Sequence, residues 1–102
     1  MYEMRIHEEA DDEFLAAIAY YESHADLGEE FLVELTKGFD QIRKHPNAWP
    51  ILARNFRQYL IHRFPYALIY DVEGNTVSVF AVAHTKRAPG YWRERIDVPK
   101  FR

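Results

Sequence analysis

The sequence predicts a single α+β domain, residues 1–102, in which an antiparallel helical hairpin packs on one face of a mostly antiparallel four-stranded sheet. Two observations lead to this fold class. The chain has the length of one domain, and 48% of its residues are hydrophobic, which is enough for one packed core. Apolar residues recur at helical spacing in the first half and at strand spacing in the second. The predicted order is strand, helix, helix and three strands, followed by a short tail.

The first half of the chain provides one strand and both helices. Residues 2–7 alternate between apolar and charged side chains, as a short half-buried strand does. Residues 8–23 are predicted to be helical, because they combine an apolar stripe with an acidic first turn that complements the helix dipole. Asp26 and Glu29 have the spacing of a capping box, and the second helix that they begin is expected to end before Pro46. The short link makes the two helices a hairpin.

The second half of the chain provides three strands. Residues 56–64, 66–72 and 76–83 are rich in Tyr, Ile, Val and Phe, and a Glu-Gly-Asn turn separates the last two. Trp49 lies between two prolines, so we expect an ordered loop whose indole packs at the edge of the core.

The charged residues are divided unequally along the chain. Residues 1–35 carry a formal charge of −10 and residues 36–102 a charge of +7, although the net charge is only −3. The division predicts one surface that repels polyanions and another that attracts them; two oppositely charged solvated surfaces are the alternative. The sequence has no cysteine, no leader-like N-terminus and no apolar run of membrane length, and we interpret it as cytoplasmic.

The acidic start of the first helix does not have the pattern of a metal site. His7 is followed closely by acids, but no second histidine lies four residues on, as a helical zinc site requires. We therefore expect the acids from Glu8 to Glu13 to be solvated. The four glycines are isolated, so no phosphate-binding loop is predicted either, and we expect neither a metal nor a cofactor.

The strand over residues 56–64 has some features of an RNA-binding surface. Arg57 and Arg63 occur with no acid between them, and Tyr59 and Ile61 alternate along the same strand. Cations and aromatic rings that alternate on a sheet bind phosphates and stack bases. The alternative is that the apolar residues belong to the core while the arginines extend from its rim.

The basic stretch from His84 to Arg95 carries the strongest functional pattern. It leaves the most apolar strand, and His84, Lys86, Arg87 and Tyr91 supply an imidazole, two cations and a phenol within a short distance in sequence. Such groups can cleave RNA, with a base that activates a 2′-hydroxyl and a cation that stabilises the charge on the phosphate. The alternative makes His84 a strand-end cap and Tyr91 part of a hydrophobic clip. We expect Trp92 in the core; Arg93 and Arg95 are solvated in the alternative, and we expect them to give at most electrostatic support.

These residues occur within an ordered set of short motifs, and with them the chain resembles the RelE/ParE superfamily of toxins, the plasmid-stabilisation type. The resemblance covers nearly the whole chain. It rests on Tyr20-Tyr21-Glu22, Leu27-Gly28 with Phe31, Pro46, Arg63-Phe64-Pro65-Tyr66, Ile69-Tyr70, Ala81-Val82-Ala83-His84 and Arg87-Ala88-Pro89-Gly90-Tyr91-Trp92.

The resemblance implies a growth-inhibiting toxin of a type II toxin–antitoxin pair. Its partner would be a cognate antitoxin, and operator DNA would be contacted only through that antitoxin. One branch of the superfamily cuts ribosome-bound mRNA, whereas another poisons DNA gyrase without being a nuclease.

Two departures from the nuclease branch concern the predicted sheet. That branch has an arginine after the aromatic residue that enters the third strand, whereas here Ala67 follows Tyr66. His62 and Arg63 stand where that branch favours lysines. Our first hypothesis is still a ribosome-dependent endoribonuclease without a metal, in which Arg57 and Arg63 bind phosphates. A gyrase inhibitor, and a degenerate member that binds only its antitoxin, are the alternatives.

Overall fold

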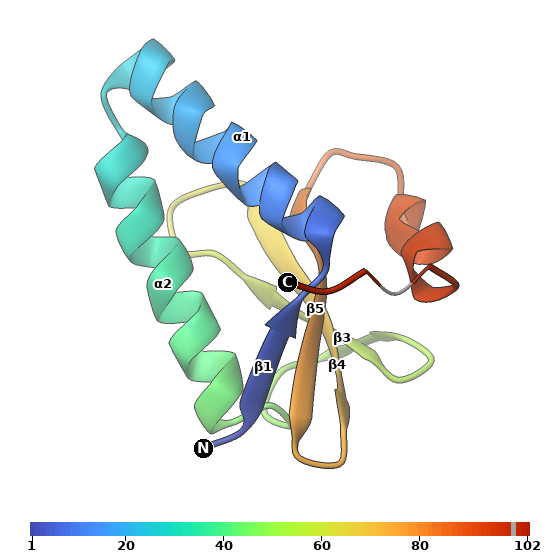
Figure 1. The fold of residues 1–102 in the computed structure, drawn as a ribbon. Coiled ribbons are helices and arrows are strands. Elements are labelled where there is room, and N and C mark those ends of the chain that lie inside the picture. Colours follow the sequence, from blue (N-terminus) through green and yellow to red (C-terminus); the bar gives the residue numbers. More distant parts are fainter. Residues whose placement is uncertain (99) are drawn as a thin grey trace.

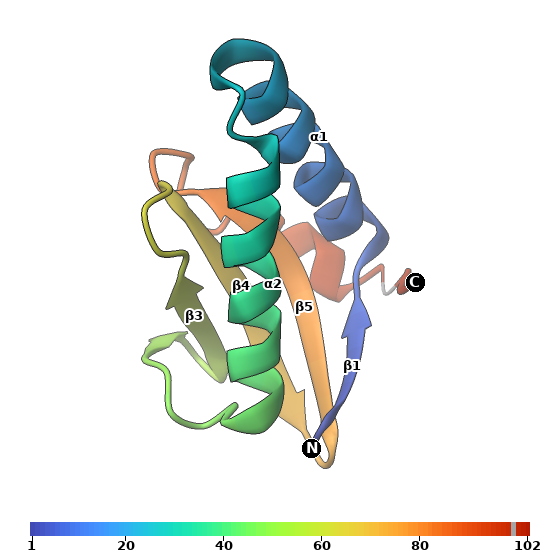
Figure 2. The same ribbon diagram turned by 90° about the vertical axis from the view of Figure 1, so that its left-hand side faces the viewer.

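The computed structural model describes residues 1–98 and 100–102 of the chain. Within these residues five strands and two α-helices form two layers, and the helices cover one face of the sheet (Figures 1 and 2). In chain order the elements are β1 (Glu3–Ile6), α1 (Glu8–Ala25), α2 (Gly28–Lys44), β2 (Ile51–Ala53), β3 (Phe56–Leu60), β4 (Tyr66–Glu73), β5 (Thr76–His84) and the 3-10 helix η1 (Tyr91–Ile96). The predicted α+β class is confirmed. None of the described helices is long and apolar enough to cross a membrane.

The sheet has the strand order β1-β5-β4-β3-β2. β1 runs parallel to β5, and the other neighbouring strands are antiparallel. The described sheet thus has one strand more than the four predicted, because β2 spans only Ile51–Ala53 and is too short to show a period of two. The strand predicted to reach residue 64 ends at Leu60, and Arg63 has a left-handed backbone with φ of 73°. An antiparallel sheet with one parallel strand remains mostly antiparallel, as expected.

Both helices begin and end close to the predicted positions, but their caps differ. The Nδ1 atom of His7 accepts a hydrogen bond from the Glu9 N–H at 3.1 Å and so caps α1. Asp26 was predicted to cap α2, and that prediction is wrong. It adopts a left-handed conformation with φ of 54° and ends α1, while Leu27 precedes α2 with no side-chain cap.

Gly38 lets α2 lie close to the sheet. A Cβ atom at this position would lie 3.0 Å from the Tyr59 ring and 3.1 Å from Leu68 Cδ1, tighter than most Cβ contacts in proteins. A glycine inside a helix costs about 1 kcal/mol relative to alanine. Here the close packing of α2 on β3 and β4 explains why a glycine occupies position 38 in spite of this cost.

The sheet separates two apolar clusters. The larger one lies between the sheet and the helices and includes Phe31, Leu35 and Tyr70. The smaller one lies on the opposite face, where Phe56, Phe80 and Trp92 pack together. The C-terminal segment therefore covers part of the sheet face that the helices leave open, which brings the predicted functional stretch onto that face.

Tyr70 makes the stability of the fold sensitive to alkaline pH. Its hydroxyl donates a 2.6 Å hydrogen bond to the Pro46 carbonyl, and burial raises its pKa to about 12. An unfolded chain loses this proton near pH 10, so the stability that Tyr70 contributes is complete below pH 10 and is lost as pH rises towards 12. We expect the free energy of unfolding to fall by at most about 1 kcal/mol per pH unit for this phenol. Urea denaturation between pH 9 and 12 measures this, and Tyr70→Phe should reduce the slope; an unchanged slope would assign the effect to other groups.

Candidate functional site

A half-open cavity of about 450 Å³ lies on the sheet face opposite the helices. Its floor consists of small or aliphatic residues of β4 and β5, namely Ala67, Ile69 and Ala83. Its apolar walls include Leu52 of β2 and Leu60 of β3, both exposed, and the buried Trp92 of η1. His84, Arg87 and Arg93 stand among the polar residues of its lining. A cavity with an apolar floor and basic residues around it suits a partner that inserts an apolar side chain and has negatively charged groups close to that side chain.

The segment after β5 is held in place by a turn and a buried aromatic side chain. The chain leaves His84, reverses through Gly90 with φ of 75°, and begins η1 at Tyr91. A Cβ atom at Gly90 would lie 2.8 Å from Arg93 Nε, so a side chain here is strained by both space and conformation. Trp92 is 2% exposed and its ring centroid lies 4.9 Å from that of Phe56. Its predicted place in the core is confirmed.

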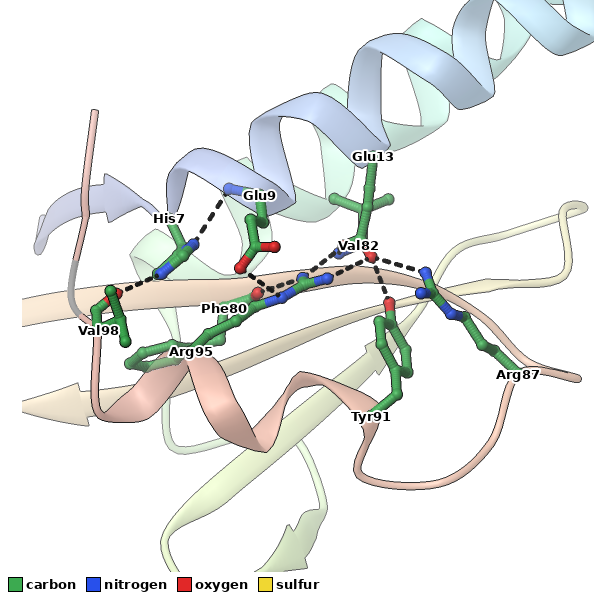
Figure 3. Close-up of polar contacts among 9 residues, drawn as sticks. All are labelled: His7, Glu9, Glu13, Phe80, Val82, Arg87, Tyr91, Arg95 and Val98. Atoms are coloured by element: carbon green, nitrogen blue, oxygen red, sulfur yellow. Dashed lines mark hydrogen bonds and ion pairs between the residues drawn. The ribbon is translucent and has the colours of Figure 1, made fainter.

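Glu13 of α1 is the centre of the polar contacts around this segment (Figure 3). Its Oε2 atom accepts hydrogen bonds from the Tyr91 hydroxyl at 2.7 Å and from Arg87 Nη1 at 3.1 Å. The guanidinium of Arg95 donates to both carboxylate oxygens, at 2.8 and 2.9 Å. Glu13 was expected to be solvated, and that expectation is wrong, because its side chain is only 14% exposed. One carboxylate thus neutralises two of the cations in the basic stretch.

Glu13 and Arg95 together replace a neighbouring strand along part of β5. β1 pairs with β5 only as far as Val79. Beyond it, the Val82 N–H donates to Glu13 Oε1 at 3.0 Å, and the Phe80 carbonyl accepts from Arg95 Nη1 at 2.9 Å. The side-chain pair therefore satisfies one donor and one acceptor on the edge of β5, as a paired strand would. Arg95 was expected to give at most electrostatic support, whereas here it is buried and fills this structural role.

Tyr91 is fixed in its protonated form by the same carboxylate. Burial and the hydrogen bond to Glu13 raise its pKa well above the usual value for a tyrosine. The guanidinium of Arg87 lies over the Tyr91 ring, 3.7 Å from its centroid. Tyr91 and Arg87 are therefore brought together as the sequence predicted, with Glu13 as a third member. Position 13 lies three residues after the buried Ala10 and four before the buried Ala17, which is the pattern that identifies an inward-facing helix position.

The other predicted residues are placed differently. His84 lines the same cavity as Tyr91, and its Nδ1 accepts a hydrogen bond from the Lys86 N–H at 3.1 Å, which is a capping role. Lys86 is exposed. Arg57 points to the Asn47 and Trp49 carbonyls at 3.2 and 2.6 Å, so its guanidinium holds the loop before β2. Arg63 is exposed in the β3–β4 turn, outside the residues that line the cavity.

Comparison with known proteins gives a family and a fold. The family model described as the ParE toxin of the type II toxin-antitoxin system, parDE, matches residues 4–89. The fold is similar to that of a solved structure described as a chromosomal ParDE TA system from P. aeruginosa, with a TM-score of 0.73 and 12% sequence identity over 84% of this chain and 98% of that chain. At this identity the structural likeness establishes the fold alone. No curated protein matches the sequence. The family match ends before Tyr91 and Arg95, the two C-terminal partners of Glu13.

Proposed function

Because the chain belongs to the ParE toxin family of type II toxin–antitoxin systems, we propose that it inhibits growth by binding DNA gyrase, without cutting mRNA. A cognate antitoxin neutralises it, and operator DNA is contacted through that antitoxin. The toxin acts in the cytoplasm, where gyrase is found.

The apolar floor of the cavity is the observation that carries this proposal. An RNA-cleaving surface needs cations and hydrogen-bond donors where the phosphates lie. Here Ala67, Ile69 and Ala83 occupy the floor, and Arg87 and Arg93 lie around it. This arrangement suits a protein segment with an apolar side chain and nearby acids better than it suits a polyanion.

The state of the proposed catalytic groups also supports a protein target. The Tyr91 hydroxyl donates a hydrogen bond to Glu13, and its raised pKa keeps the phenol protonated, so it is not available as a general base. Arg87 pairs with the same carboxylate, which reduces the charge it offers to a phosphate. The nuclease hypothesis requires these groups to leave Glu13 before they act on RNA.

A pair of assays on the purified toxin tests the proposal. We expect it to inhibit supercoiling of relaxed plasmid by gyrase and to leave ribosome-bound transcripts intact in primer-extension mapping. The product of the neighbouring antitoxin gene should restore supercoiling when added in equimolar amount. Transcripts cut at codon boundaries with gyrase unaffected would instead identify a nuclease. A toxin inactive in both assays that still binds the antitoxin would identify a degenerate member.

A further inference from the structure

The end of β3 presents backbone groups that lack a neighbouring strand. The Ile61 N–H donates a hydrogen bond to the Tyr66 carbonyl, so the backbone N–H of Ile61 points towards β4. The peptide groups of successive residues in a strand point to opposite sides, so those of Gln58 and Leu60 point away from β4. The Gln58 N–H is used by the Pro50 carbonyl at 3.1 Å. Among the described residues, no backbone group is paired with Leu60 on that side.

Pro50 ends the pairing of β2 with β3. A proline has no N–H, so it cannot return a hydrogen bond to the Gln58 carbonyl opposite it. The preceding chain, from Asn47 to Trp49, instead turns towards Arg57, which binds two of its carbonyls. The sheet therefore has an open position at Leu60, on the side of β3 away from β4.

A hollow lies on each face of the sheet at this open position. The cavity described above lies on one side and is lined by Leu52, Gln58 and Leu60. A second hollow of about 260 Å³ is lined by Trp49, Pro50 and Tyr59, with Gln58 and Leu60. The side chains of an added strand alternate between the two faces. Such a strand would fill both hollows with apolar side chains at alternate positions.

The charge around the two hollows and one buried donor indicate which kind of segment fits this open position. The residues that line the two hollows lie within residues 46–70 and 74–93, and these two ranges contain no Asp or Glu and six Lys and Arg residues. A complementary segment is therefore acidic as well as apolar. The indole N–H of Trp49 is buried with no acceptor in the described part of the chain. Buried donors without a partner are rare, and a carbonyl of an added segment would supply the acceptor.

We propose that an extended segment of the cognate antitoxin adds as a strand to β3 at Leu60, on the same side of β3 as β2. The segment is acidic and has apolar side chains at alternate positions. It covers the cavity and so silences the toxin. Strand addition gives affinity through main-chain hydrogen bonds and specificity through the alternate pockets. The inference rests on neutralisation by an antitoxin, as proposed above, and adds the place and conformation of the bound segment.

Amide hydrogen exchange on the full toxin, free and in its antitoxin complex, tests this placement. We expect the Leu60 amide to exchange at least tenfold more slowly in the complex. Leu60→Pro removes this donor at an edge position where a proline is tolerated, and Leu60→Ala is the matched control that keeps it. Leu60→Pro should weaken antitoxin binding in calorimetry at least tenfold more than Leu60→Ala, with the same circular dichroism spectrum for both variants.

Three results would overturn the inference. A complex in which the Leu60 amide exchanges as in the free toxin places the antitoxin elsewhere. Protection of this amide that depends on toxin concentration alone identifies a second copy of the chain as the occupant. Equal affinities of Leu60→Pro and Leu60→Ala show that the donor is not used. If the neighbouring gene product does not bind the toxin at all, the proposed function fails as well, and the two failures are therefore distinguishable.

Discussion

Replacing Glu13 by alanine is expected to lower the free energy of unfolding by about 3–5 kcal/mol. The substitution removes every partner of the Arg95 guanidinium except the Phe80 carbonyl and the exposed carboxylate of Glu9. It also leaves the Val82 N–H without its acceptor. A buried charge without a partner is costly, and a domain of this size has only about 5–15 kcal/mol of stability. Urea denaturation with a check for an unchanged m-value measures the loss.

Glu9 provides the matched control for this substitution. It contacts the same guanidinium, with its Oε2 atom 3.4 Å from Arg95 Nε, but its side chain is 61% exposed. Glu9→Ala should therefore cost less than about 1 kcal/mol. Equal losses for the two variants would mean that Glu13 has no special role.

A double variant shows whether Glu13 and Arg95 act only as an ion pair or also take the place of a strand paired with β5. Apolar residues in place of both members of a buried ion pair often restore stability. Glu13→Leu combined with Arg95→Met should instead stay at least about 2 kcal/mol below the wild type, because the Val82 N–H and the Phe80 carbonyl both lose their partners. Full recovery of stability would contradict the role that we assign to this pair on the edge of β5.

Replacing Ala67 by arginine is expected to reduce growth inhibition at least about a hundredfold in plating assays, a loss of roughly 3 kcal/mol in target binding. Ala67 is 4% exposed and lies on the floor of the cavity. An arginine here can extend through the half-open cavity, so it occupies the volume that we assign to an apolar anchor. The nuclease hypothesis predicts the opposite result, since that branch has an arginine at this position and an added cation would strengthen phosphate binding.

Ala67→Leu is the control for this prediction. Leucine adds apolar volume without charge, so it shows how much of the effect comes from filling the cavity. Thermal denaturation of both variants separates loss of target binding from loss of fold. Undiminished toxicity of a folded Ala67→Arg variant would remove the cavity from the proposed mechanism.

Much of the fold follows from local patterns in the sequence. The change of hydrophobic period from 3.6 to 2 near residue 50 determines the hairpin and the three long strands, because each element must bury one face. The place of Trp92 in the core was also predictable, since a large aromatic side chain close after an apolar strand has little else to pack on. The short β2 was not predictable, because three residues carry no period and the strand exists only through its pairing with β3.

The sequence also singled out the stretch from His84 to Tyr91, part of which lines the cavity, but it did not show the electrostatic state of these residues. When only neighbours in sequence are considered, nothing indicates a partner for the cations of Arg87 and Arg95 or for the phenol of Tyr91. Their partner, Glu13, lies more than 70 residues away and reaches them because α1 crosses β5 where β1 has ended. Hydrogen bonds between residues so far apart depend on the packing of helix on sheet. Local sequence therefore determined which side chains this protein has near its open face, and only the tertiary structure decided which of them remain free to bind a partner.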